Sequence, residues 1–347
     1  MIERAPSRAP ANRVAPLAVT MGEPAGIGGE ITLKAWRHGG QPFFCIDDPS
    51  RLARLSATLG LAVPIGEIGR PEEAAAVFPV ALPVLAERLA IAVEPGQPAT
   101  ANGEAVRRSI ERAVAFTQAG QAAAVVTNPI HKHSLYQAGF GFPGHTEFLA
   151  HLAGPGVTSV MMLACPTLRV IPVTVHQPLT AAIRTLSSAG IVHCCRVADT
   201  ALRRDFGLSR PRIAVSGLNP HAGEGGDMGD EEITIIEPAL SVLRRDGIDV
   251  SGPYPADALF SERQRSGYDV AVCMYHDQAL IPIKTLDFDG AVNVTLGLPF
   301  VRTSPDHGTA FDIAGRGIAR EHSLLAALRM AADMARARSS AEAAASS

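Results

Sequence analysis

The chain contains 347 residues, which is enough for one large domain or for two domains of ordinary size. Hydrophobic residues make up 47% of the sequence and charged residues 19%, a balance that argues against a long disordered chain. A formal net charge of −3 and an aromatic content of only 5% argue against a surface that binds nucleic acid.

Predicted strands and helices alternate along the chain. Nearly continuous apolar runs predict strands at residues 14–20, 122–126, 159–164, 168–175, 212–218, 268–275 and 291–296. Apolar residues at helical spacing predict helices at 102–119, 189–205 and 322–337. Because the strand runs are nearly continuous rather than alternating, we expect strands buried on both faces, in a parallel or mixed sheet. The sequence therefore predicts an α/β fold with helices on both faces of the sheet.

The remaining segments are predicted loops and chain ends. A Gly-rich loop at 22–29 follows the first strand, and residues 92–100 form a long surface loop. Residues 1–13 and 339–347 are expected to be frayed termini. The five cysteines are odd in number and form no CxxC pair, which favours reduced thiols in a cytoplasmic protein. No apolar run approaches ~18 residues, so we expect no membrane span.

Uncommon polar residues cluster directly after four of the predicted strands. These clusters are Thr127–Lys132, His176–Pro178, Asn219–Gly226 and His276–Gln278. In open α/β sheets, ligands bind outside the carboxyl ends of the strands. We therefore expect the four segments to deliver functional groups to one edge of the sheet.

Three of these segments carry a histidine at a matching position: His176, His221 and His276. Neutral imidazole is the commonest side-chain metal ligand, and three such groups on separate strand ends can hold one ion and leave positions open for a substrate. The alternative is that some of them are ordinary core or surface histidines, since the tight spacing of an HExxH motif is absent.

A second group of residues indicates a phosphate site at the same edge. It comprises Lys132, Lys284 and Arg302, together with a helix that we expect to begin at Thr146 in the segment 144–147. Helix N-termini, lysine and arginine all bind phosphate, the last as a planar fork. The alternative for each cation is a solvated surface charge.

The loop at 22–29 does not read GxGxxG, and the chain has no Walker A lysine pattern. Neither a Rossmann fingerprint nor a P-loop is therefore present. The loop is equally well interpreted as a tight turn between a strand and a helix.

Five long motifs together resemble the 4-hydroxythreonine-4-phosphate dehydrogenase family. They are GEPAGIG (22–28), PGHTEFLA (143–150), GLNPHAGEGG (217–226), MYHDQ (274–278) and NVTLGLPFVRTSPDHGTAFDIAGRG (293–317). The similarity runs from about residue 14 to residue 335. It implies a fold like that of isocitrate and isopropylmalate dehydrogenases, with two α/β/α subdomains and a cleft between them. The first subdomain would comprise 14–140 plus 293–338, and the second, 141–292, would carry the metal site and the dimer interface.

The resemblance also implies roles for particular residues, all of which are present in this chain. The metal ligands would be His176, His221 and His276, in a site shared across a homodimer interface. The substrate-binding residues would be His145, Thr146, Lys284, Asn293 and Arg302. Asp257 matches an acidic position near the metal, and either Lys284 or Asp257 would act as the general base.

The implied reaction is the oxidation of the C3 hydroxyl of 4-phosphooxy-L-threonine by NAD or NADP, followed by decarboxylation. It requires one divalent metal, which the sequence leaves open among zinc, magnesium, manganese and cobalt. The residues that bind the nicotinamide cofactor are not identified. Related enzymes oxidise phosphorylated sugar acids, such as 4-phosphothreonate or 4-phosphoerythronate, or dihydrodiols of aromatic acids. A metal-dependent aldolase or hydrolase of sugar phosphates and a non-catalytic phosphate-binding module are the alternatives from other classes.

Overall fold

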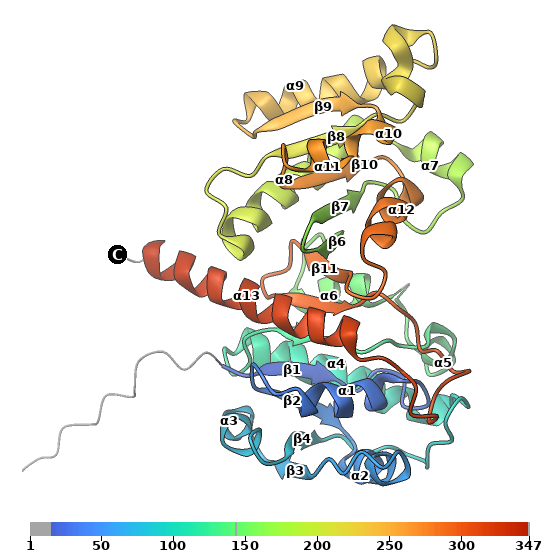
Figure 1. Cartoon of the computed structure of the whole chain (residues 1–347), viewed down its shortest axis with the longest axis vertical. Helices are drawn as coiled ribbons and strands as arrows, with labels where there is room; N and C mark the ends of the chain where they lie inside the picture. Colours follow the sequence, from blue (N-terminus) through green and yellow to red (C-terminus); the bar gives the residue numbers. More distant parts are fainter. Residues whose placement is uncertain (1–14, 143, 346–347) are drawn as a thin grey trace, which may run out of the picture.

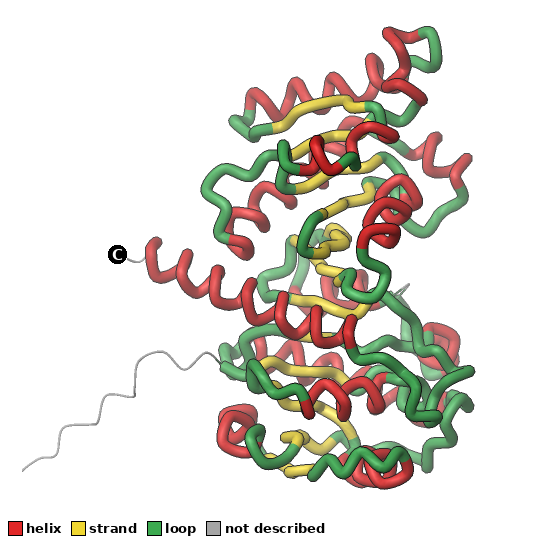
Figure 2. Tube along the Cα trace, in the orientation of Figure 1, coloured by secondary structure: helices red, strands yellow, loops and turns green. Residues whose placement is uncertain are grey.

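The computed structural model describes residues 15–142 and 144–345, which form one mixed β-sheet covered by helices on both faces (Figure 1; Figure 2). The sheet formed by these residues has 12 strands. In chain order they are β1 (Leu17–Thr20), β2 (Phe43–Asp47), β3 (Ile65–Ile68), β4 (Leu82–Ala86), β5 (Val125–Val126), β6 (Val160–Cys165), β7 (Leu168–Pro172), β8 (Ile213–Ser216), β9 (Val250–Tyr254), β10 (Val270–Cys273), β11 (Val292–Leu296) and β12 (Arg302–Pro305).

The helices connect successive strands. The α-helices are α1 (Gly28–Arg37), α2 (Pro49–Thr58), α3 (Ala74–Val77), α4 (Gly103–Gln118), α5 (Lys132–Gln137), α6 (His145–Ala153), α7 (Leu179–Thr185), α8 (Ser188–Phe206), α9 (Glu237–Arg245), α10 (Ala256–Leu259), α11 (Glu262–Arg265), α12 (His276–Leu286) and α13 (His322–Ala345). Four further helical turns are η1 (Pro71–Glu73), η2 (Thr100–Asn102), η3 (Pro220–Gly226) and η4 (Glu232–Ile236).

The sheet consists of two parallel halves joined by antiparallel strands. Its order is β3-β4-β2-β1-β5-β12-β11-β6-β7-β10-β8-β9. The first six strands of this order pair in parallel, as do the last four. Strand β11 runs antiparallel to both β12 and β6, and β6 runs antiparallel to β7. The ladder is therefore continuous from one half to the other, and the centre of the sheet lies at β12, β11 and β6.

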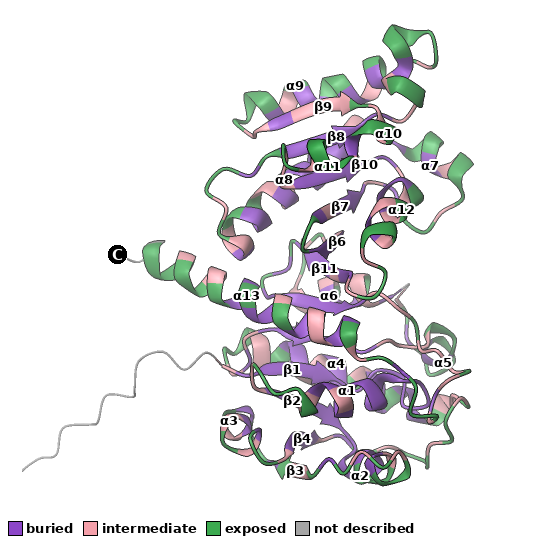
Figure 3. Cartoon of the chain, in the orientation of Figure 1, coloured by how far each residue is buried: buried purple, intermediate pink, exposed green. Residues whose placement is uncertain are grey.

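The core consists of layers on the two faces of this sheet. Along β1, Leu17 and Val19 contribute to one hydrophobic cluster and Ala18 to another, as expected when successive side chains point to opposite faces. Helices α1, α8, α9 and α13 pack into the first cluster, α4 and α6 into the second, and α12 into a third. Figure 3 shows strands that are largely buried between half-exposed helices. The prediction of an α/β fold with strands buried on both faces is confirmed.

All seven predicted strands and three predicted helices are present, with end positions that differ by a few residues. The sequence analysis missed five strands, β2, β3, β4, β9 and β12. It was also wrong about the C-terminal tail, because α13 continues to Ala345 instead of fraying from residue 339. The tail is rich in alanine, the residue with the highest helix propensity. The predicted frayed segment 1–13 lies outside the described residues.

The subdomain boundaries proposed from the sequence remain a prediction. The sheet runs without interruption across residue 293, which lies on β11. No helix in the described part of the chain is long and apolar enough to cross a lipid bilayer.

A buried carboxylate attaches α13 to α8. Asp205, which is 2% exposed, accepts hydrogen bonds from Arg204 at 2.7 and 3.0 Å and from Arg338 at 2.8 and 2.9 Å. Removing one partner from a buried ion pair leaves the other charges desolvated and uncompensated. We therefore expect Asp205→Asn to lower the free energy of unfolding by about 3 kcal/mol in urea titrations.

The matched control is Asp246→Asn, because Asp246 pairs with Arg196 at 2.6 Å but both side chains are exposed, at 37% and 54%. A surface pair contributes less than about 1 kcal/mol. Equal losses in the two variants would contradict the assignment of Asp205 as the residue that attaches α13.

Candidate active site

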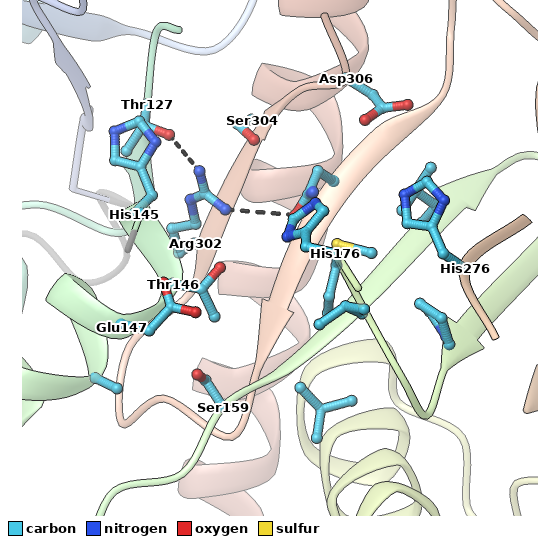
Figure 4. A pocket seen from close by; sticks show the side chains of 18 of the residues that line it. Thr127, His145, Thr146, Glu147, Ser159, His176, His276, Arg302, Ser304 and Asp306 are labelled. Atoms are coloured by element: carbon cyan, nitrogen blue, oxygen red, sulfur yellow. Dashed lines mark hydrogen bonds between the residues drawn. The ribbon is translucent and has the colours of Figure 1, made fainter. Parts of the chain in front are cut away.

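A cavity of about 1200 Å³ lies where the two halves of the sheet meet (Figure 4). Its walls come from the ends of β5 and β7, the start of β6, strands β11 and β12, and helices α6, α8 and α12. Seven of the nine predicted site residues line it: His145, Thr146, His176, His276, Lys284, Asn293 and Arg302. Segments far apart in sequence therefore converge here, much as the polar residues after the strands predicted.

Arg302 is a buried cation without a carboxylate partner. Its strand, β12, has the sequence RTSP and is buried at every residue. The Arg302 Nη atoms donate to Thr295 Oγ1 at 2.9 Å and Thr127 Oγ1 at 2.6 Å, whereas its buried Nε donates to nothing. Within the described residues, no carboxylate lies within 4.0 Å of it, and burial lowers the pKa of the guanidinium to about 10. A buried charge normally requires a partner, so the site is suited to an anionic ligand.

The N-terminus of α6 lies in the same part of the cavity. The helix begins at His145, one residue before the predicted start, and its capping residue is Gly144. Burial, reinforced by the positive charges of Arg302 and Lys132, holds the pKa of His145 well below its usual value. The ring is therefore neutral near pH 7, and its buried Nε2 has no hydrogen-bond partner. Unpaired backbone N–H groups, the helix dipole and this free ring nitrogen all favour a phosphate oxygen.

Lys284 also lines the cavity, from α12, and an acidic residue holds it there. Its Nζ lies 3.0 Å from Asp306 Oδ2 and 5.5 Å from the centre of the Phe288 ring. Asp306 follows β12 and also lines the cavity. The sequence analysis missed this carboxylate as a site residue, although it stands in the quoted motif SPDHGTAF. The ion pair fixes the ammonium group at the cavity wall.

His176 and His276 form a pair at the carboxyl ends of the neighbouring parallel strands β7 and β10. Their ring centres are 5.7 Å apart. His176 has a φ of 47°, in the left-handed region that a non-glycine residue rarely adopts and that is enriched at functional sites. Burial, followed by the charges of Lys132 and His276, lowers the pKa of His176, which keeps the ring neutral.

The second histidine of the pair has a carboxylate behind it. His276 Nδ1 donates to Asp277 Oδ1 at 2.7 Å, so its Nε2 is free to act as a ligand. A carboxylate behind an imidazole is the common arrangement at metal sites, because it fixes the tautomer and raises ligand basicity. Two histidines so arranged fit a divalent metal and supply part of its ligand set.

His221 and Asp257 lie elsewhere. His221 is in η3, with a side chain that is 60% exposed and an Nδ1 that lies 3.0 Å from Glu224 Oε1. Asp257 is exposed on α10, which packs against η3. Neither lines the cavity, and the described residues of one chain contain no cluster of three or more His, Cys, Asp or Glu able to hold a metal. Within the described residues of one chain, His221 therefore does not lie with His176 and His276, and the metal site shared across a dimer interface stays a prediction.

Hydrogen bonds to Glu232 nevertheless hold the loop that carries His221 in place. Glu232 accepts hydrogen bonds from the backbone of Leu218 at 2.7 Å and of Asn219 at 2.8 Å, and from the Asn219 side chain at 2.9 Å. Burial alone would raise the pKa of Glu232, but these hydrogen bonds outweigh it and lower the pKa. The loop thus holds an exposed histidine in a defined conformation away from its own cavity.

The Gly-rich loop at 22–29 packs against the cavity wall rather than opening into it. Gly22 has a φ of +67°, and a Cβ at this position would lie 2.6 Å from Asn128 Cβ. The backbone N–H of Glu23 donates to Pro129 O at 2.8 Å. The loop therefore supports Asn128, a cavity residue, as a tight turn would.

The sheet, the cation-lined cavity and the paired histidines define an α/β enzyme that acts on a small anionic molecule. The chain belongs to the family of the pyridoxal phosphate biosynthetic protein PdxA, whose family model matches residues 40–331. A 4-hydroxythreonine-4-phosphate dehydrogenase from Bradyrhizobium diazoefficiens is 56% identical over 338 residues, covering 93% of this chain and 98% of the relative. One from Caulobacter vibrioides is 51% identical, covering 92% and 97%.

Solved structures agree with this family. The crystal structure of 4-hydroxythreonine-4-phosphate dehydrogenase from Klebsiella pneumoniae has a TM-score of 0.85 at 41% identity, covering 92% of this chain and 99% of that one. A terephthalate 1,2-cis-dihydrodiol dehydrogenase from Burkholderia xenovorans has a TM-score of 0.64 at 31% identity, covering 92% and 98%. The fold is thus shared with enzymes that differ in substrate.

Proposed function

We propose that this protein oxidises the C3 hydroxyl of 4-phosphooxy-L-threonine with NAD(P), in pyridoxal phosphate biosynthesis. The hydroxyl carbon gives a hydride to the nicotinamide and the hydroxyl loses a proton, which yields 2-amino-3-oxo-4-phosphooxybutanoate. This β-keto acid loses CO2 to give 3-amino-2-oxopropyl phosphate. The observation that carries the proposal is the buried, carboxylate-free Arg302 beside the start of α6, in a chain whose relatives carry this enzyme name.

The cavity suggests how the substrate is oriented. Arg302, His145, Thr146 and the N-terminus of α6 would bind the phosphate, and Asn293, on the ladder beside β12, would contact the same end. The histidine pair lies at another part of the cavity and would face the reacting hydroxyl (Figure 4). Anchoring the phosphate away from the reacting carbon lets its binding energy serve orientation.

A divalent metal is part of this proposal. His176 and His276 of one chain and the partner subunit's His221 would hold it, where it would acidify the substrate hydroxyl and stabilise the negative charge that develops on decarboxylation. The exposed position of His221, outside its own cavity, supports a site completed by a second copy. Lys284 lines the cavity, and Asp257 lies on α10 beside the turn that carries His221, so either residue would act as the general base.

Exposed apolar residues indicate where the second copy would pack. Seven of the exposed large apolar residues lie on α7, on and after α12, and around η4: Leu179, Ile183, Ile281, Leu286, Phe288, Met228 and Ile233. These elements adjoin or carry the histidine-bearing segments. Apolar side chains gathered on the active-site elements are typical of a homodimer interface.

The cofactor and the cellular location complete the proposal. The cavity volume of about 1200 Å³ exceeds what a small phosphorylated amino acid fills, which leaves room for a nicotinamide group beside it. The five cysteines are all free and buried, as expected for a protein of the reducing cytoplasm.

The test is an absorbance assay for NADH with NAD, 4-phosphooxy-L-threonine and a panel of divalent metals. We expect NADH formation that depends on added metal and is lost after chelation. Turnover of 4-phosphothreonate or 4-phosphoerythronate instead would move the protein to the sugar-acid dehydrogenases. NADH from none of these substrates would exclude the proposal and favour a metal-dependent aldolase.

A further inference from the structure

Lysine is rare in this chain. Of its 31 Lys and Arg residues only three are lysines, Lys34, Lys132 and Lys284. A chain that uses arginine almost everywhere else retains lysine at positions where a compact ammonium group with three donors has an advantage. Lys34 is such a case, since its Nζ donates to Glu30 Oε1, Gly317 O and Ala319 O at 2.8, 2.9 and 2.6 Å. The other two lysines both line the active-site cavity.

Lys132 lies beside the start of α6. It is the first residue of α5, and its side chain returns toward Gly144, the capping residue of α6, where a Cβ would lie 3.6 Å from Lys132 Nζ. Glu147 Oε2 would lie 3.4 Å from the same point, yet it does not come within 4.0 Å of the ammonium group. Across the described residues, Lys132 has no carboxylate partner.

The charges that face the cavity show which cations are free to bind an anion. Lys284 is paired with Asp306, and burial keeps the His145 ring neutral. Among the described residues that line the cavity, Lys132 and Arg302 remain as cations without a carboxylate partner. Both also lower the pKa of His145, so both charges act on that ring.

We propose that Lys132 is a further substrate-binding residue, which supplies the second positive charge to the phosphate group held by Arg302 and the start of α6. A phosphate monoester carries about −1.5 to −2 charges at pH 7. Arg302 contributes one positive charge and a helix N-terminus about half of one, so the full dianion keeps about half a negative charge that a further cation can neutralise. The assignment rests on the phosphorylated substrate of the proposed function and adds to it a residue that determines specificity.

The test compares Lys132→Met, which removes the charge, with Lys132→Arg, which retains it. We expect Lys132→Met to raise the KM for 4-phosphooxy-L-threonine by about 10- to 100-fold, with a much smaller change in kcat. Inorganic phosphate, titrated by calorimetry into the metal-loaded enzyme, should bind more weakly by a similar factor. Lys132→Arg should recover most of both losses. The control is Arg54→Met, which removes an exposed charge on α2, outside the cavity.

The two measurements separate this inference from the proposed function. Calorimetry with inorganic phosphate needs no turnover, so it decides the role of Lys132 even if the wild-type enzyme oxidises none of the phosphorylated substrates. Unchanged phosphate affinity in Lys132→Met overturns the assignment. A raised KM with unchanged phosphate affinity also overturns it, because Lys132 would then contact another part of the substrate. Since Lys132 is exposed, thermal unfolding of all variants should match the wild type.

Discussion

His221→Ala and His276→Ala are each expected to be inactive as pure proteins, and to regain about a quarter of the wild-type activity when mixed in equal amounts and allowed to exchange subunits. If a site takes His176 and His276 from one chain and the partner subunit's His221, a mixed dimer contains one site with every ligand and one site that lacks two. Half of the dimers are mixed, and half of their sites are intact. A site built within one chain could not recover in this way, because no chain in the mixture carries both histidines.

A matched pair of variants controls for the exchange itself. His176→Ala and His276→Ala remove ligands that the structure places together in one chain, 5.7 Å apart. A mixture of these two variants should remain inactive. Recovery in this control, or no recovery with His221→Ala, would contradict the shared metal site.

Arg302→Met is expected to lower kcat/KM by about 100- to 1000-fold, because it removes a desolvated donor to the phosphate. The same change should cost little stability. Arg302 is 3% exposed and, among the described residues, donates to neutral oxygens. Replacing it with an apolar side chain of similar length therefore leaves no buried carboxylate without a partner. Steady-state kinetics and urea unfolding measure the two effects separately.

The contrasting variant is Arg51→Met. Arg51 is also buried, but it donates to both oxygens of the buried Asp47, at 2.8 and 2.7 Å. Its removal leaves the Asp47 carboxylate buried without a partner, which should lower the free energy of unfolding by about 3–5 kcal/mol. A large stability loss in Arg302→Met, comparable to that in Arg51→Met, would mean that Arg302 serves the fold rather than a ligand.

The sequence could predict those strands and helices in which apolar residues follow one regular pattern along the whole segment. Strands such as β8 and β10 are short apolar runs buried on both faces, and α4 and α8 carry apolar residues at helical spacing. Several of the missed strands break these patterns. Strand β4 contains Pro83 and β9 contains Gly252 and Pro253, residues that argue against a central strand. Strand β2, by contrast, is a buried apolar run of the same kind as β8 and β10, and its pattern could have been found in the sequence.

The active site shows the same limit. Polar residues after strands predicted most of the cavity, because the carboxyl ends of strands are where side chains reach a ligand. Strand β12 escaped notice because its sequence, RTSP, is polar. In the structure, Arg302 donates to Thr295 on β11 and to Thr127, directly after β5, so its burial depends on partners outside the strand. Like His176 and His276, His221 follows a predicted strand. Its spacing in the sequence does not show whether its side chain reaches the cavity of its own chain or that of a second copy.

The anion-binding residues and the histidines are attached to the fold in different ways. Arg302 and Asn293 belong to strands in the centre of the ladder, where Asn293 pairs with Ser304 and Arg302 with Val125. The three histidines lie outside the ladder, His176 in the loop after β7, His221 in η3 and His276 at the start of α12. A mutation that moves the anion-binding residues disturbs the middle of the sheet. A mutation that changes the conformation of the histidine-bearing segments does not. A new substrate specificity therefore disturbs the fold least when the anion-binding residues are kept and the histidine-bearing segments change.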